Sequence, residues 1–90
     1  MVGIAGSENQ QDCVARVELR EQGGIEIKIT GKNVKLFGRL MEAAAADAAG
    51  ELGVRAAYIE INDNGSLDFV IKARTKTAIR RAWRECGEEA

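Results

Sequence analysis

Apolar and polar residues alternate along two stretches in the first half of the chain. One stretch begins at Cys13, the other runs from Ile25 to Thr30, and Gly23-Gly24 lies between them. Alternation with a period of two is typical of a strand with one buried face, and a glycine pair favours a tight turn. The pattern therefore predicts two strands that are joined as a hairpin.

A helical spacing follows the second stretch. Asn33 can cap a helix by accepting a hydrogen bond from a free backbone N–H, and Gly53 suits the left-handed residue that commonly follows a helix. The apolar positions between them recur every three or four residues and are expected to face the sheet: Phe37, Leu40, Met41, Ala44, Ala45, Ala48 and Leu52.

The second half repeats this order. Alternating runs over residues 57–61 and 67–73 flank Asn64-Gly65, a pair that favours a hairpin because both residues tolerate positive φ. A last helix is expected from the apolar stripe Ala78, Ile79, Ala82, Trp83 and Cys86. The predicted order is ββαββα, which indicates an α+β fold in two layers, with two helices on one face of an antiparallel sheet.

The first twelve residues show no strand or helix period. Small residues are followed there by a polar run from Ser7 to Asp12, which predicts a flexible N-terminal arm over residues 1–12. The remaining residues, 13–90, are expected to form a single α+β domain, because the chain of 90 residues contains no proline and no low-complexity linker.

Composition argues against a self-sufficient enzyme. The chain has no histidine, the side chain best suited to proton transfer and metal ligation at neutral pH. We therefore expect no catalytic residues and no metal site. The formal net charge of −1 creates no general attraction to nucleic acid or to an anionic membrane. The chain contains neither a secretory signal nor an apolar run of about 20 residues, so the expected location is the cytoplasm.

Two further features have plain interpretations beside functional ones. The segment Lys72–Arg84 contains six basic residues and no acidic one. It could contact a partner protein, a phosphorylated ligand or nucleic acid, or it could be a solvated helix face. Cys13 and Cys86 lie far apart and form no C-x-x-C motif, so both are expected to be small buried residues.

Several blocks of the chain resemble the acyl carrier (gamma) subunit of citrate lyase. The resemblance extends over about residues 34–82 and is carried by Leu36-Phe37-Gly38, Leu52-Gly53-Val54-Arg55, Asn62-Asp63-Asn64-Gly65-Ser66-Leu67-Asp68 and Ile71-Lys72-Ala73-Arg74. It is weaker through the first hairpin and Ala5-Gly6. The resemblance implies a non-catalytic carrier subunit of a lyase complex.

In that family, a serine of the N-terminal arm is esterified to 2'-(5''-phosphoribosyl)-3'-dephospho-CoA, whose thiol carries acetyl and citryl as thioesters. The implied partners are the alpha (acyl transferase) and beta (citryl lyase) subunits and the transferase that attaches the prosthetic group. Neither nucleic acid nor a membrane is implied.

The attachment residue is the point at which this chain departs from the family. An ungapped match of Ala5-Gly6 and Asp12 puts Gln10 where the family has its modified serine, and glutamine cannot form the phosphodiester. The related carrier subunit of malonate decarboxylase has a serine directly after a glycine, as Ser7 follows Gly6. We therefore predict covalent attachment at Ser7. The alternative is an interaction subunit of a multi-enzyme complex that carries no group.

Overall fold

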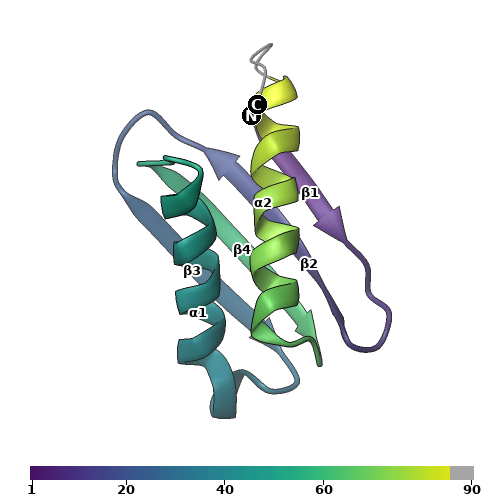
Figure 1. Cartoon of the computed structure of the whole chain (residues 1–90). Helices are drawn as coiled ribbons and strands as arrows, with labels where there is room; N and C mark the ends of the chain where they lie inside the picture. Colours follow the sequence, from purple (N-terminus) through teal and green to yellow (C-terminus); the bar gives the residue numbers. More distant parts are fainter. Residues whose placement is uncertain (86–90) are drawn as a thin grey trace.

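The computed structural model describes residues 1–85, which form a four-stranded sheet with both helices on one face (Figure 1). The elements are β1 (Val2–Gly6), β2 (Asp12–Leu19), β3 (Ile25–Gly31), α1 (Val34–Glu51), β4 (Ala57–Asn64) and α2 (Asp68–Glu85). The α+β class in two layers is thus confirmed. Cys86, which was expected on the stripe of the last helix, lies outside the described residues.

The strand order is β1-β2-β4-β3, so the sheet is mixed. Strand β2 pairs antiparallel with β1 and β4, whereas β3 pairs parallel with β4. The hairpin expected between the strands now labelled β2 and β3 does not form, because β4 lies between them. Helix α1 crosses over the sheet and connects β3 to β4, so that the two strands run parallel. Strand β4 thereby lies in the interior of the sheet, between β2 and β3. The central position suits β4, since its inward residues Ala57, Ile59 and Ile61 are fully buried.

Helix α1 packs on the sheet through small side chains. Its buried residues are Met41, Ala44, Ala45, Ala48 and Ala49. Phe37 and Leu40, which were expected in this core stripe, are 47% and 58% exposed. The end of the helix agrees with the prediction, because Gly53 follows it with a φ of 74°.

The alternating run over residues 67–73 is a helix start and not a strand. Leu67 and Phe69 are exposed, and the buried residues of α2 follow helical spacing: Ile71, Thr75, Ala78, Ile79 and Ala82. Asn64-Gly65 therefore does not form the turn of a hairpin, because a helix and not a strand follows it. The carboxylate of Asp63 accepts hydrogen bonds from the backbone N–H groups of Gly65 (3.2 Å) and Ser66 (2.9 Å), which turns the chain toward α2. This local hydrogen bonding and the burial of one helix face outweigh the strand-like pattern.

Most of the segment expected to be a flexible arm is an ordered strand. Residues 2–6 pair with residues 14–18 of β2, and Ala5 is 2% exposed. The guanidinium of Arg81, on α2, donates a hydrogen bond of 2.7 Å to the backbone carbonyl of Ile4. The structure therefore differs from the expected arm: of residues 1–12, only Met1 and residues 7–11, which connect β1 to β2, lie outside the strands.

Gly3 sets the distance between β1 and α2, and its replacement is expected to destabilise the fold. A Cβ at this position would lie 1.8 Å from the carbonyl oxygen of Ala78 and 2.5 Å from the amide nitrogen of Ala82. Gly3→Ala should lower the free energy of unfolding by about 1–3 kcal/mol, because α2 must shift away from the sheet. Urea unfolding monitored by Trp83 fluorescence or circular dichroism measures the change.

Gly50→Ala is the matched control. Apart from its chain neighbours and the backbone of its own helix, no atom lies within 4 Å of a Cβ at that position near the end of α1. Alanine favours a helix over glycine by up to about 1 kcal/mol, so this variant should be equally or more stable than the native chain. Equal effects of the two substitutions would contradict the close packing of β1 on α2.

Candidate functional site

Ser7 begins the connection between β1 and β2. The preceding Gly6 has a φ of 103°, and a Cβ there would lie 1.8 Å from the carbonyl oxygen of Cys13, so a glycine is required. The backbone N–H of Ser7 donates to that same carbonyl over 3.1 Å. The glycine thereby directs the half-exposed Ser7 side chain into the space beside the start of β2.

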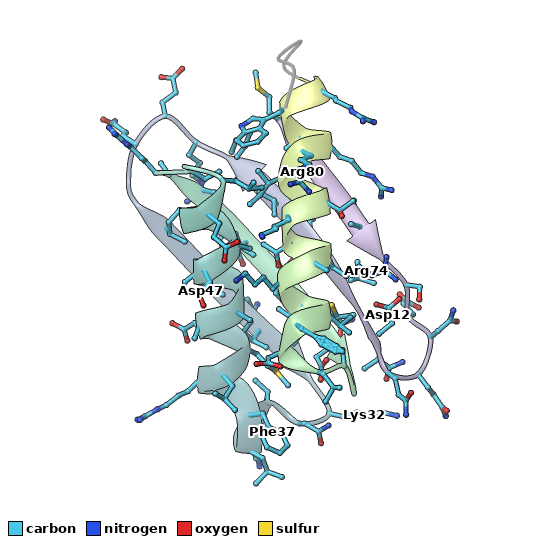
Figure 2. All side chains as sticks on the ribbon, viewed as in Figure 1. Asp12, Lys32, Phe37, Asp47, Arg74 and Arg80 are labelled. Atoms are coloured by element: carbon cyan, nitrogen blue, oxygen red, sulfur yellow. The ribbon has the colours of Figure 1, made fainter. Side chains whose placement is uncertain are left out.

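The hydroxyl of Ser7 belongs to a small polar network with Asp12 and Arg74. Ser7 Oγ donates to Asp12 Oδ2 over 2.7 Å. Arg74 binds the same carboxylate with two donors, Nε to Oδ1 at 3.0 Å and Nη2 to Oδ2 at 2.8 Å. Figure 2 shows Arg74 on α2 next to Asp12 at the start of β2. The network thus joins the serine-bearing turn to the second helix.

These contacts keep the Asp12 carboxylate ionised. The hydrogen bonds from Arg74 lower its pKa most, and those from the Ser7 hydroxyl and the Cys13 backbone N–H lower it further, so the pKa lies well below its usual range. The same pair raises the pKa of Arg74. Such an acidic carboxylate is a weak base. Asp12 can therefore orient the Ser7 hydroxyl but is a poor acceptor for its proton.

The remainder of the turn is attached to the end of β4. The N–H of Gln11 donates to the carbonyl of Asn64 over 2.9 Å, and the Asn64 amide donates to the carbonyl of Glu8. Gln10 lies exposed within this turn, three residues beyond Ser7. Gln10, which the resemblance aligns with the family's modified serine, is thus at the surface, but its side chain has no hydroxyl.

The chain's second serine, Ser66, is placed differently. It is 8% exposed, and its hydroxyl donates to the buried carboxylate of Asp63. Cys13 is fully buried nearby, and burial is the main reason that its pKa is raised to about 11. A thiol with such a pKa stays protonated and unreactive at neutral pH. Ser7 is therefore the serine that a partner can reach.

Most of the basic segment on α2 is used within the fold. Four of its six cations contact the chain itself: Lys72 and Lys76 bind Glu51, Arg74 binds Asp12, and Arg81 binds the carbonyl of Ile4. Lys72 and then Lys76 lower the pKa of Glu51 to about 2. Arg80 and Arg84 are exposed. The segment is thus mainly a set of cations that fix α2 to α1, β1 and β2.

Two kinds of site have no support in the part of the chain that the structure describes. Residues 1–85 contain no group of three or more histidine, cysteine, aspartate or glutamate side chains placed to hold a metal ion. Within the same residues, no helix combines the length and the apolar character needed to cross a membrane.

The sequence alone points to Ser7 but gives no sign of its two neighbours in the network. In the sequence, Arg74 is one cation of a basic segment and part of a block that resembles the family. Asp12 and Arg74 are separated by 62 positions, and no local pattern signals a contact over that distance.

Comparison with known proteins agrees with the resemblance. The family model ACP, described as malonate decarboxylase delta subunit (MdcD), matches residues 2–82. The chain is 40% identical over 81 residues to the citrate lyase acyl carrier protein of Fusobacterium nucleatum, with 90% of this chain and 86% of the relative covered. It is 38% identical over 79 residues to that of Clostridium perfringens, with 88% and 78% covered. It is also 36% identical over 81 residues to that of Haemophilus influenzae, with 90% and 83% covered.

The matched residues include all four strands, α1 and most of α2, so the similarity extends over nearly all of the described fold and includes the turn that bears Ser7. The chain belongs to the family of acyl carrier proteins described by the malonate decarboxylase delta subunit model, in which its similarity to citrate lyase acyl carrier proteins is extensive.

Proposed function

We propose that this chain is the acyl carrier subunit of a citrate lyase-type complex, with its prosthetic group attached to Ser7. The observation that carries the proposal is the position of Ser7. It is the accessible one of the two serines, it lies in a turn at one end of the molecule, and its hydroxyl is oriented by a neighbouring carboxylate. It is also the only hydroxyl-bearing side chain before Thr30.

The residues around Ser7 suit a phosphodiester. Attachment forms a bond between Ser7 Oγ and a phosphorus atom of an activated donor, while the hydroxyl proton and the donor's leaving group depart. Asp12 holds the hydroxyl in one orientation, and the transferase has to supply the base, because the carboxylate is too acidic to serve as one. Arg74 places a cation beside the position of the new negative charge, which offsets its repulsion from Asp12.

The prosthetic group proposed is 2'-(5''-phosphoribosyl)-3'-dephospho-CoA. It supplies a thiol at the end of a long flexible arm, on which acetyl and citryl are carried as thioesters. Because β1 is fixed to β2 and α2, the reach between partners comes from this group and not from a mobile N-terminal arm. The protein body holds one end of the group in place while the other end moves.

The chain itself is proposed to be non-catalytic. Its partners are then an alpha-type subunit that transfers acyl groups, a beta-type subunit that cleaves the citryl thioester, and the transferase that loads Ser7. Tethering of the thioester turns each transfer into an intramolecular event at a roughly millimolar effective concentration. The citrate lyase assignment is supported by relatives that bear this name and are 36–40% identical to the chain.

Removal of the Ser7 hydroxyl should abolish loading. Intact-mass analysis of the protein from its native host should show a species heavier than the bare chain, and Ser7→Ala should have the bare mass. The added mass should map to the tryptic peptide of residues 1–16, in which Ser7 is the only hydroxyl side chain. Carrier-dependent cleavage of citrate should be lost together with the added mass.

Gln10→Ala is the control for this experiment, because it alters the same turn without removing a hydroxyl. It should keep the added mass. Native protein with the mass of the bare chain would instead support the non-carrying interaction subunit, and added mass on Ser7→Ala would exclude Ser7 as the attachment residue.

The ionised state of Asp12 gives a second prediction. Asp12→Asn keeps a hydrogen-bond acceptor but removes the charge, so the free energy of unfolding at pH 7 should fall by about 1–2 kcal/mol. In the native chain, the depressed pKa of Asp12 stabilises the fold above the unfolded-state pKa of about 3.9, and this stabilisation is lost as the pH falls toward the folded-state pKa. The difference between variant and native chain should therefore be smaller at pH 3 than at pH 7.

Urea unfolding at the two pH values measures this difference. Asp47→Asn, a neutralisation of an exposed carboxylate on α1 (Figure 2), is the control and should have little effect at either pH. A deficit of Asp12→Asn that is equal at pH 3 and pH 7 would show that the charge of Asp12 does not stabilise the turn.

A further inference from the structure

Exposed apolar side chains lie at the starts of both helices, in the first two turns of α1 and at the beginning of α2. Seven large apolar side chains are exposed in the described residues, and five of them lie at these helix starts. The five are Leu36 (79% exposed), Phe37 (47%), Leu40 (58%), Leu67 (64%) and Phe69 (57%). We call these five residues the helix-start surface. Apolar residues that are exposed together on a small protein are typical of an interaction surface.

The fold does not need these side chains for its core. Helix α1 contacts the sheet through Met41 and a set of alanines, and α2 does so through a stripe that starts at Ile71. Phe37 lies one turn before the buried Met41, and Leu40 lies one turn before the buried Ala44, so both stand at a spacing that would suit a core position. They are exposed because the packing of α1 on the sheet leaves the side chains of its first two turns in contact with solvent.

The helix-start surface lies at the same end of the molecule as Ser7. Both helices begin at the end where the β1–β2 turn lies, and Figure 2 shows Phe37, Lys32 and Asp12 toward that end. The turn is also connected to the start of α2, since Asp12 forms a bridge with Gly65 and Asn64 binds the carbonyl of Glu8. A partner that reaches Ser7 from this end meets the apolar surface as well.

A groove extends this surface to the edge of the sheet. It has a volume of about 510 Å³ and lies between the start of α1 and β3, with Leu36, Leu40 and Ile29 among its lining residues. Strand β3 is an edge strand, and its inward isoleucines are only partly buried under the small side chains of α1. The groove can therefore accept an apolar side chain from another protein.

The charges beside the α1 part of this surface, around Leu36, Phe37 and Leu40, are mainly positive. Lys32, Lys35 and Arg39 form no ion pair within the described residues, and the first turn of α1 contains no acidic side chain. Cations at a helix N-terminus oppose the helix dipole, and the Asn33 side chain makes no capping hydrogen bond there. Glu8, Glu42 and Asp68 are exposed carboxylates at this end of the molecule, whereas Asp12 is paired with Arg74 and Asp63 is buried. Within residues 32–42, which surround the α1 part of the surface, three cations stand against one carboxylate, Glu42.

This charge pattern decides between possible occupants. A second copy of the chain would bring two sets of unpaired cations together across the same apolar residues, which is unfavourable. A surface with apolar side chains surrounded by carboxylates would complement it in both respects. We propose that the helix-start surface is the docking site for a subunit of the lyase complex that presents such an acidic, apolar face next to the Ser7 turn. The identity of this partner rests on the proposed function.

Binding of the bare chain to the purified alpha- and beta-type subunits tests this proposal. The chain is produced in a host without the prosthetic-group transferase, so that no attached group contributes to the affinity. Replacement of Leu36, Phe37 and Leu40 by serine should weaken binding to at least one subunit by about tenfold or more. Thermal unfolding should remain close to that of the native chain, because the three side chains are exposed.

Ile4→Ser is the matched apolar control. Ile4 is 51% exposed on β1, outside the helix-start surface, and its substitution should leave the affinity unchanged. For the charges, Lys35→Glu should weaken binding severalfold and reduce its dependence on salt, whereas Arg80→Glu, an exposed position on α2 (Figure 2), should not. Equal losses in the controls, or native affinity in the triple serine variant, would overturn the proposal.

The outcomes separate this proposal from that of Ser7 loading. A native chain without added mass contradicts attachment at Ser7 but leaves the binding assay unaffected. Sedimentation velocity provides a further check, since self-association that the triple serine variant abolishes would assign the surface to a second copy and overturn docking of a lyase subunit. Failure of both subunits to bind the bare native chain would overturn it as well.

Discussion

The close contact between β1 and α2 is the constraint on which the rest of the structure depends. Gly3 has no room for a Cβ against the backbone of Ala78 and Ala82, and Arg81 binds the carbonyl of the next residue, Ile4. These contacts hold the first strand against the second helix and thereby set the position at which the chain leaves β1. The turn that bears Ser7 starts directly after this fixed strand, so its location follows from the packing of two backbones.

The polar network continues this constraint into the functional region. Arg74 is on the same helix that holds β1, and it binds the carboxylate that accepts the Ser7 hydrogen bond. A single helix thus determines both the start of the turn and the orientation of the hydroxyl at its base. The proposed carrier function fits this arrangement, because a fixed attachment residue leaves the prosthetic group as the part that moves between partners.

The placement of small and large apolar residues on α1 also bears on the function. Alanine at the contact face of α1 lets the helix approach the sheet closely, and this contact does not use the larger apolar residues of its first turns. Those residues remain exposed at the end of the molecule that presents Ser7. Attachment and docking would then share one end, while the open face of the sheet carries mainly polar and charged residues of β2, β3 and β4.

The sequence by itself determined the class of the fold, the two-layer arrangement, the strands now labelled β2, β3 and β4, the helix α1 with its end at Gly53, and the candidate serine. These features depend on local periodicity, on turn chemistry and on recognisable residue blocks. Tertiary structure decided the rest: that β4 lies between β2 and β3, that residues 2–6 form a strand, that residues 67–73 enter a helix, and that Asp12 meets Arg74. Each of these depends on contacts between residues far apart in the chain, whose free energy outweighs local preference and leaves no local pattern to read.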